Sequence, residues 1–401
     1  MRPPSMLPTG ILVLAFILGL GAFAPLRVQA QTFSVIYNFT GKNTDGGYPL
    51  AGFVIDSAGN LYGTVSQGGA SWNGAVIKVT QSGQESLLYS FTGGTDGSTP
   101  EASLLMDSQG NLYGTTYAGG ANGLGTVFKV SSSGQETLLY SFAGGTADGA
   151  NPQASLVMDN RGNFYGTTTV GGAYGAGTVF ELSKNGKESV LYSFAGGTAD
   201  GANPIAGVTL GAGETLYGTT SAGGTDTYGT VFQLTPIVAT TSKHWKENIL
   251  HNFTHQGDGD VPYAGLIFDK AGNLYGAATG GGANSGGTIF ELTPSAGGWN
   301  FNVLYSLPGW DISGVFQNLF LDSSGNIWGT THCDGTYQAG TVYELTNSAG
   351  TWNYNSMYVF TGNNDGLFSY SNLVFDSHGN LYGTAKLGGE YNNGVVFKIT
   401  P

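Results

Sequence analysis

The residues best suited to chemistry in this chain are the few histidines and aspartates that depart from an otherwise repetitive sequence. Imidazole and carboxyl groups act as general acids and bases and as metal ligands. The candidate catalytic residues are His332, Asp334, Asp311 and His255. The candidate metal ligands are Asp258, Asp260 and His255. The competing interpretation is that these positions have drifted because nothing depends on them.

Aromatic residues in loops of the same sequence form a second candidate site. Their rings can stack on the apolar faces of sugars, and they can equally pack on neighbouring loops. The candidate binding residues are Trp72, Tyr117, Tyr174, Tyr228, Trp310, Tyr337 and Tyr391. Both interpretations stay open from the sequence.

Signatures of common enzymes do not occur. The chain has no Gly-x-Ser-x-Gly elbow, no His-Glu-x-x-His helix and no phosphate-binding loop. Cys333 is the single cysteine, so it forms no internal disulfide, and we interpret it as a small, half-buried apolar residue.

One phrase recurs along the chain and indicates the scaffold that positions these residues. It reads Asp-x-x-Gly-Asn-Leu-Tyr-Gly-Thr and begins at Asp56, Asp107, Asp159, Asp269, Asp322 and Asp376. A degenerate copy stands at residues 216–219. The copies follow one another at about 50 residues, a period typical of solenoids and propellers.

Each period contains four short runs with strand character, which we label A to D from the axis outwards. In the second copy they are residues 102–107, 111–116, 125–130 and 136–142. Four antiparallel strands repeated seven times predict an all-β, seven-bladed β-propeller. The last copy lacks strand D, and residues 33–39 match the D phrase. We therefore predict that residues 33–39 form the outer strand of the last blade and close the ring.

In a propeller the D–A and B–C loops share one face, so the departures from the repeat should meet there. The histidine-bearing loops belong to blades five and six, which are neighbours. If they form a catalytic site, His332 and the His255 loop should converge in one pocket at the centre of the ring. The Asp-x-x-Gly-Asn turns and the aspartates of the D–A loops we interpret as turn caps, with calcium binding as the alternative. We expect no cofactor other than calcium.

Residues 1–30 have a basic start, an apolar run and small residues at their end, and these features predict a signal peptide. Residues 31–401 would then be a single propeller domain, secreted or held in the periplasm or cell envelope. No second apolar stretch follows, so we expect no membrane span after cleavage. A net charge of −13 argues against nucleic acid as a partner. We expect a monomer.

The repeated motifs resemble those of the GloVer (Gloeo–Verruco) tandem-repeat proteins, which are secreted bacterial proteins. The resemblance covers residues 33–401 and rests on four motifs: Asp-Gly-x-x-Pro, the Asp-x-x-Gly-Asn phrase, Gly-Thr-Val-Phe-Glu-Leu and Leu-Tyr-Ser-Phe. It implies repeats of propeller type and brings no defined catalytic residues.

Taken together, these features predict an exported, non-catalytic binding or scaffold propeller whose ligand is a polysaccharide or a surface protein. The alternative is a carbohydrate-active enzyme, a lyase or hydrolase, with its site on the D–A/B–C face near blades five and six.

Overall fold

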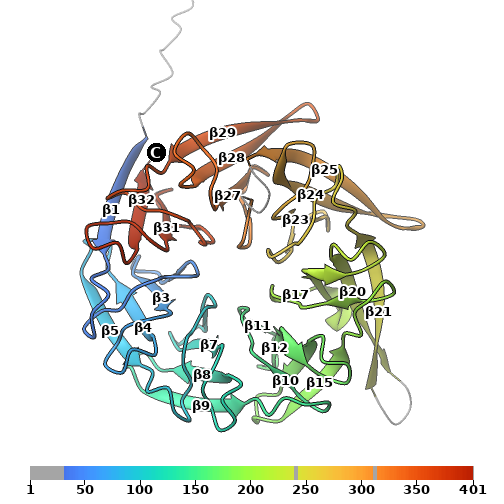
Figure 1. Cartoon of the computed structure of the whole chain (residues 1–401), viewed down its shortest axis with the longest axis horizontal. Coiled ribbons are helices and arrows are strands. Elements are labelled where there is room, and N and C mark those ends of the chain that lie inside the picture. Colours follow the sequence, from blue (N-terminus) through green and yellow to red (C-terminus); the bar gives the residue numbers. More distant parts are fainter. Residues whose placement is uncertain (1–30, 239–242, 310–313, 401) are drawn as a thin grey trace, which may run out of the picture. The chain divides into compact units, whose positions relative to one another are not determined.

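The computed structural model of this chain describes residues 31–238, 243–309 and 314–400. The chain divides after Ala30, and residues 31–401 form one compact unit. Within the described residues of this unit, seven four-stranded antiparallel sheets stand around a common centre (Figure 1). The predicted all-β, seven-bladed propeller is confirmed. The one helical element of the described residues is a short 3-10 turn, η1 (Ala212–Glu214). None of their helices could span a membrane.

The first four blades take their strands in chain order, from the axis outwards. Blade one contains β2 (Val54–Ile55), β3 (Leu61–Val65), β4 (Ala75–Val79) and β5 (Glu85–Ser90). Blade two contains β6 (Leu105–Met106), β7 (Leu112–Thr116), β8 (Thr126–Val130) and β9 (Glu136–Ser141). Blade three contains β11 (Val157–Met158), β12 (Phe164–Thr168), β14 (Thr178–Leu182) and β15 (Glu188–Ser193). Blade four contains β17 (Thr209–Leu210), β18 (Leu216–Thr220), β20 (Thr230–Val238) and β21 (Lys243–Asn252).

The last three blades follow the same order, and the outer hairpins of blades five and six are long, like that of blade four. Blade five contains β22 (Ile267–Phe268), β23 (Leu274–Ala278), β24 (Ser285–Ser295) and β25 (Gly298–Pro308). Blade six contains β26 (Phe320–Leu321), β27 (Ile327–Thr331), β28 (Thr341–Ser348) and β29 (Thr351–Val359). Blade seven contains β30 (Val374–Phe375), β31 (Leu381–Ala385), β32 (Val395–Thr400) and β1 (Thr32–Asn38).

Strand β1 supplies the outer strand of blade seven. It pairs antiparallel with β32, with Phe33 opposite Ile399 and Val35 opposite Phe397. The two strands lie side by side although they come from opposite ends of the described chain (Figure 1). Phe33 and Val35 pack against the buried cluster of blade seven. The ring of blades therefore depends on contacts between its first and last strands.

The repeated motifs have structural roles inside each blade. Asp56 accepts hydrogen bonds from the backbone N–H groups of Ala58 and Asn60, from the Asn60 side chain and from the Tyr62 hydroxyl. The same set recurs around Asp107 and Asp376, so the aspartate caps the A–B turn. Glycine in the middle of strand B leaves room for the next strand, since a Cβ on Gly114 would lie 2.7 Å from the Phe128 ring.

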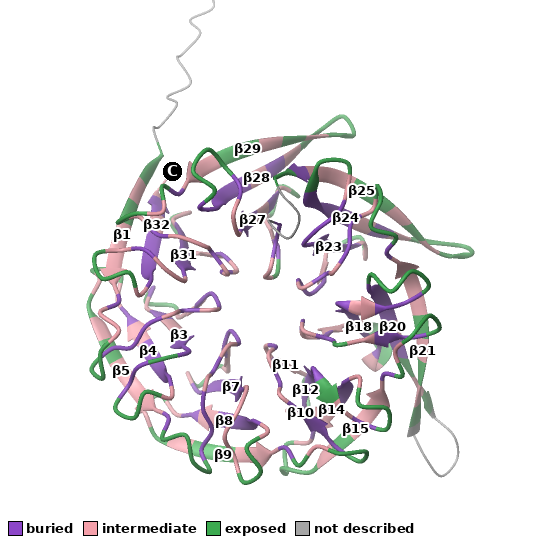
Figure 2. Cartoon of the chain, in the orientation of Figure 1, coloured by how far each residue is buried: buried purple, intermediate pink, exposed green. Residues whose placement is uncertain are grey.

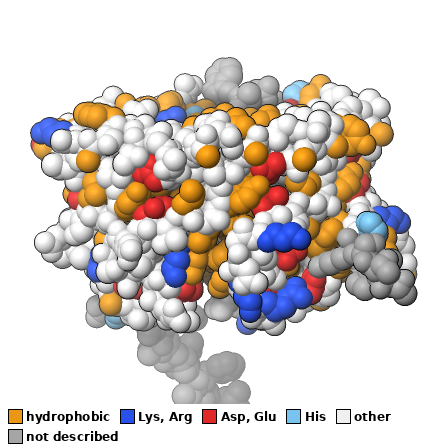
Figure 3. Space-filling view, turned by 90° about the horizontal axis from the view of Figure 1, so that it is seen from below, with side chains coloured by type: hydrophobic (Ala, Val, Ile, Leu, Met, Phe, Trp, Pro, Cys, Tyr) orange, Lys and Arg blue, Asp and Glu red, His pale blue; other side chains and the backbone are white. Residues whose placement is uncertain are grey.

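The core lies between the blades, as face-to-face packing of sheets requires. Buried residues concentrate in the middle strands, whereas the outer hairpin tips are exposed (Figure 2). The outer strands run around the circumference, so the start of each outer strand meets the end of the preceding one (Figure 1). Figure 3 looks onto part of this outer wall and shows acidic side chains beside hydrophobic ones at several places around it.

On one face, the entry loop of each of six blades, one to five and seven, is paired with the B–C loop of the same blade. In blades three and four the pairing forms two-stranded sheets, β10 (Gly149–Ala150) with β13 (Val170–Gly171) and β16 (Gly201–Ala202) with β19 (Ala222–Gly223). Single bridges such as Gly47 to Gln67 and Asp260 to Gly280 do the same elsewhere. These pairings hold the chain in place where it enters these blades beside the axis.

Candidate functional site

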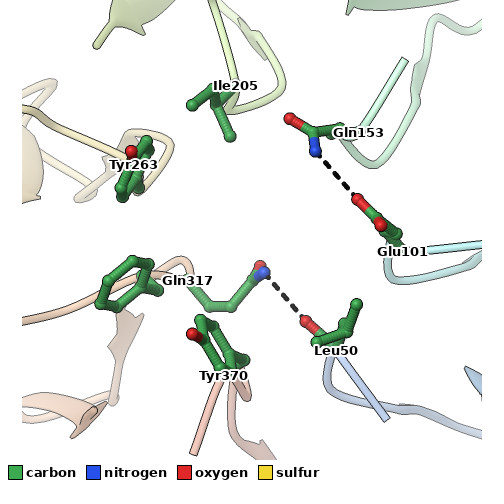
Figure 4. A pocket seen from close by; sticks show the side chains of 8 residues that line it. Leu50, Glu101, Gln153, Ile205, Tyr263, Gln317 and Tyr370 are labelled. Carbon is green, nitrogen blue, oxygen red and sulfur yellow. Dashed lines mark hydrogen bonds between the residues drawn. The ribbon is translucent and has the colours of Figure 1, made fainter. Parts of the chain in front are cut away.

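A cavity of about 260 Å³ lies at the centre of the ring, where the chain enters the blades. It is lined by one residue from each of the seven blades and by Gln317 of blade six (Figure 4). The seven residues stand at the same position of the repeat, six residues before the A–B turn begins. They are Leu50, Glu101, Gln153, Ile205, Tyr263, Phe316 and Tyr370. A ring of equivalent positions thus carries seven side chains of six different types.

The backbone that leads into the cavity is held in an uncommon conformation. In six blades a residue other than glycine, two positions before the lining residue, has a positive φ angle. These residues are Tyr48, Thr99, Asn151, Asn203, Val261 and Phe368. For a β-branched residue such as Val261 this conformation is rare, and it persists only where the surroundings enforce it. The lining positions are therefore fixed by the scaffold.

Blades five, six and seven form an aromatic wall of the cavity. The rings of Tyr263 and Phe316 are stacked with centroids 5.1 Å apart, and Phe316 meets Tyr370 edge-on at 5.0 Å. All three side chains are half-buried, so part of each ring faces the cavity. Such a surface offers stacking area to the apolar face of a ligand.

Blades two and three form a polar wall across the cavity. The Gln153 side-chain amide donates a hydrogen bond of 2.9 Å to the Glu101 carboxyl group (Figure 4). Burial raises the pKa of Glu101, while the hydrogen bond from Gln153 and the charge of Lys386 oppose this shift. A carboxyl and an amide held together in this way can accept and donate hydrogen bonds to hydroxyl groups.

His332 lies behind the aromatic wall. Its ring stacks on Phe368 at 4.4 Å and contacts Phe316 and Tyr370, and its Nε2 lies 3.5 Å from the Tyr370 hydroxyl. Its Nδ1 is buried and has no hydrogen-bond partner among the described residues. Burial, aided by the charge of Lys386, lowers the pKa of His332 to about 4. At neutral pH this imidazole is uncharged and a weak base, and it supports Tyr370 by packing.

Lys386 is the basic residue beside this wall. Its Nζ lies 5.2 Å from the centroid of the Tyr370 ring. Tyr117, His332 and Lys386 occupy one repeat position, immediately after strand B, where the other blades carry serine or threonine. The hydroxyl of Ser66 at this position bonds to the backbone carbonyl of Tyr48, and Ser221 bonds in the same way to Asn203. His332 and Lys386 at this position instead contact Tyr370 of the aromatic wall, and neither lines the cavity itself.

Asp334 and Cys333 take part in packing next to His332. Asp334 is buried and accepts hydrogen bonds from the hydroxyls of Thr331 and Tyr354. Burial raises the pKa of the Asp334 carboxyl, and burial with the nearby Asp334 charge raises the pKa of the Cys333 thiol. Neither residue lines the central cavity.

The His255 loop lies apart from this cavity. His255 stacks on Tyr228 of blade four with centroids 5.0 Å apart and contacts Asp260. Asp258 accepts hydrogen bonds from Thr254 and pairs with His251 at 2.9 Å, as the aspartates of other entry loops pair with tyrosines. Neither His255, Asp258 nor Asp260 lines the central cavity. The structure therefore does not bring His255 and His332 into one pocket.

The remaining sequence candidates lie outside the central cavity or outside the described residues. Trp310 and Asp311 lie outside the described residues. No three or more His, Cys, Asp or Glu residues of residues 31–238, 243–309 and 314–400 gather closely enough to hold a metal ion. The remaining aromatic candidates do not line the cavity: Tyr117 is half-buried, and the exposed ones lie in loops of five different blades. The exposed residues are Trp72, Tyr174, Tyr228, Tyr337 and Tyr391.

The lining residues themselves were not among the sequence candidates, although a signal for them exists. The repeat reads Asp-Gly-x-x-Pro before the lining position and Ala or Ser after it in most blades, so the variable residue stands between constant ones. A position that varies within a constant framework indicates a site where blades differ in what they contact. Variation at one position of the repeat is therefore the sequence signal that could have identified the lining residues.

One comparison with a solved structure, that with the TM-score of 0.52, supports the fold. A structure from Bacteroides uniformis, of a protein provisionally named a 6-phosphogluconolactonase, is 14% identical with a TM-score of 0.52 and covers 84% of this chain and 93% of its own. A structure of a protein from Thermus thermophilus, provisionally named an oxidoreductase (glucose dehydrogenase), is 16% identical to this chain with a TM-score of 0.43. The match covers 75% of this chain and 96% of the Thermus chain. No curated protein matches the chain in sequence.

The repeat itself is the basis for assigning a family. Residues 18–232 and 210–401 match the model of the Gloeobacter/Verrucomicrobia repeat, which confirms the resemblance drawn from the motifs. The chain belongs to the Gloeobacter/Verrucomicrobia repeat family.

Proposed function

We propose that this protein is an exported, non-catalytic binding protein and that its central cavity recognises a polysaccharide. The observation that carries the proposal is the division of the cavity into an aromatic wall and a facing carboxyl–amide pair. Sugars present an apolar face of C–H groups and a rim of hydroxyl groups, and these match the two walls. Export rests on the predicted signal peptide of residues 1–30.

The central cavity is a stronger candidate than the exposed aromatic residues. Tyr263, Phe316 and Tyr370 contact one another in a row, whereas Tyr174 and Tyr337 stand in loops of blades three and six. Stacking surfaces that act together on one ligand need to be contiguous. A protein partner would favour the exposed loop aromatics, so the two ligand classes predict different sensitive residues.

Binding to a panel of soluble polysaccharides, measured by calorimetry or affinity electrophoresis, tests the proposal. Tyr370→Ala should weaken binding about five- to thirtyfold, because it removes a stacking surface worth about 1–2 kcal/mol. Tyr174→Ala serves as the matched control, an exposed tyrosine outside the cavity, and should leave binding within about twofold. If Tyr174→Ala abolishes binding and Tyr370→Ala does not, the site is in the loops. If no polysaccharide binds, a surface protein becomes the better ligand class.

A carbohydrate-active enzyme remains the second candidate, and the geometry favours it less. Glycoside hydrolysis commonly uses two carboxyl groups, and Glu101 is the one carboxylate among the described lining residues. Proton abstraction by a lyase needs a stronger base than His332, whose pKa is lowered to about 4 by burial. Release of reducing ends or unsaturated sugars from a bound polysaccharide, lost in Glu101→Gln, would favour the enzyme over the binding protein.

A further inference from the structure

Gln317 occupies a repeat position at which other blades carry small residues. The equivalent residues are Ala51, Ala102, Ala154, Ala206, Ala264 and Ser371. Blade six therefore projects a long polar side chain where its neighbours project a methyl or hydroxymethyl group. This position follows the lining residue directly, and in blade six its side chain lines the central cavity as well.

The Gln317 side chain reaches across blade seven to blade one. Its Nε2 donates a hydrogen bond of 3.3 Å to the backbone carbonyl of Leu50 (Figure 4). It lines both the central cavity and a second, smaller cavity of about 70 Å³. The smaller cavity is bordered by residues deeper in blades two to six, such as Ser155, Val208 and Asn318. Gln317 is thus one of five residues that line both spaces, with Gln153, Ile205, Tyr263 and Phe316, and among these five it alone stands one position after the ring of equivalent lining residues.

The lining residues of the central cavity surround the axis of the ring. Every blade contributes one of them, so the cavity is centred on the axis and does not run along one pair of blades as a groove. A polymer lying across the face would leave the cavity unfilled. A chain end entering along the axis would place its last unit between the aromatic wall and Glu101.

We propose that the cavity receives saccharide chains end-on and that Gln317 determines its depth, so that the protein binds chain ends rather than chain interiors. This inference rests on the proposed function. Gln317 meets the tip of the bound chain with its amide group, and the aromatic wall holds the same unit from the side.

The stoichiometry of binding tests the inference. Xylo-, cello- and chito-oligosaccharides and the corresponding longer soluble chains would be titrated into the mature protein, with calorimetry giving the number of protein molecules per chain. End-on binding predicts a number that stays constant as the chain lengthens. A number that grows in proportion to chain length, with binding still sensitive to Tyr370→Ala, overturns end-on binding and leaves the proposed function standing. Absence of binding to all of these chains, or binding insensitive to Tyr370→Ala, counts against the proposed function itself.

Substitution of Gln317 tests its own role. Gln317→Ala should weaken the binding of short chains about three- to tenfold, as expected for the loss of a hydrogen bond to the chain tip. Ser371→Ala, at the same repeat position in blade seven, is the matched control and should change the affinity by less than about twofold. Its hydroxyl bonds to a backbone carbonyl and does not line the cavity. Equal affinities of Gln317→Ala and the unaltered protein would show that Gln317 does not contact the chain.

Discussion

The molecule has two sectors that differ at the same repeat positions. In blades one to four the outer strand carries a glutamate at one register position, opposite a buried residue of strand C. In blades five to seven that position carries Phe301, Tyr354 and Phe33. The cavity divides in the same way, since blades one to four contribute Leu50, Glu101, Gln153 and Ile205, and blades five to seven contribute aromatic residues.

The contacts between neighbouring outer strands, which we call seams, show what the difference means physically. In the aromatic sector Phe301 stacks on His251 at 3.6 Å and Phe33 stacks on Tyr358 at 3.7 Å. In the other sector each glutamate lies near the aspartate of an entry loop and has one buried oxygen without a hydrogen-bond partner. These glutamates are Glu85, Glu136, Glu188 and Glu247. One backbone repeat therefore accepts two kinds of seam, and only the seams with a glutamate should change in stability between pH 7 and pH 8.5.

Deletion of β1, which lies where the two sectors meet, should cause the largest loss of stability. Phe33 stacks in the seam with blade six, and Tyr37 bonds to Asp45 beside Glu85 of blade one. Deletion of residues 31–38 exposes the edge of β32 and removes these contacts, so we expect the melting temperature to fall by about 10 °C or the protein to aggregate. Scanning calorimetry with light scattering measures both. An equally stable, monomeric truncated protein would show that β1 does not hold the ring together.

Disruption of a single aromatic seam should cause the next largest loss of stability. Phe301→Ala removes contacts with His251, Phe253 and Phe290, so we expect a loss of about 2–4 kcal/mol in the free energy of unfolding. This loss should be the same at pH 7 and pH 8.5, because no glutamate belongs to that seam. Denaturant unfolding at both pH values measures it, and a loss that varies with pH would contradict the division into sectors.

The carboxylate seams predict that the protein is less stable in mildly alkaline solution. Burial and the facing aspartates raise the pKa of Glu85 to about 7, of Glu136 to about 6, of Glu188 to about 8 and of Glu247 to about 7. Because these values exceed those of the unfolded chain, the folded state binds more protons, and stability falls as pH rises through them.

The melting temperature, measured between about pH 6.5 and about pH 8.5, tests this prediction. Below this range, His332 acts in the opposite direction, since its folded pKa is lowered and its stabilisation is lost as pH falls. The melting temperature should decline steadily through the range. A variant with all four glutamates replaced by glutamine should lose this decline, and a decline that persists would place its cause outside the seams.

The smallest expected effect is that of one carboxylate. Glu188→Gln removes a buried negative charge near Asp148, so it should raise stability by about 1 kcal/mol at pH 8.5 and change it little at pH 5. The matched control is Glu181→Gln, a glutamate on the neighbouring strand β14. Equal effects of the two substitutions at pH 8.5 would argue against a special role of the seam position.

The candidate site was predicted less completely than the fold. His332 could be singled out because it breaks the repeat, and it does lie beside the central cavity. Its anticipated partner, the His255 loop, packs instead on Tyr228. Loop conformation depends on contacts between blades, and a one-dimensional pattern does not contain them. The lining residues were not predicted because Leu, Gln or Tyr at the entry to a strand is common in any single repeat.

The propeller, its seven blades and the turn chemistry of each blade could be predicted from the amino-acid sequence. These features depend on strands and turn caps that interact within one repeat of about 50 residues. Which side chains face one another across the axis depends on how the blades assemble. Glu101, Phe316 and Gln317 are far apart along the chain, and closure of the ring brings their equivalent positions together around one point. The function proposed here comes from that convergence.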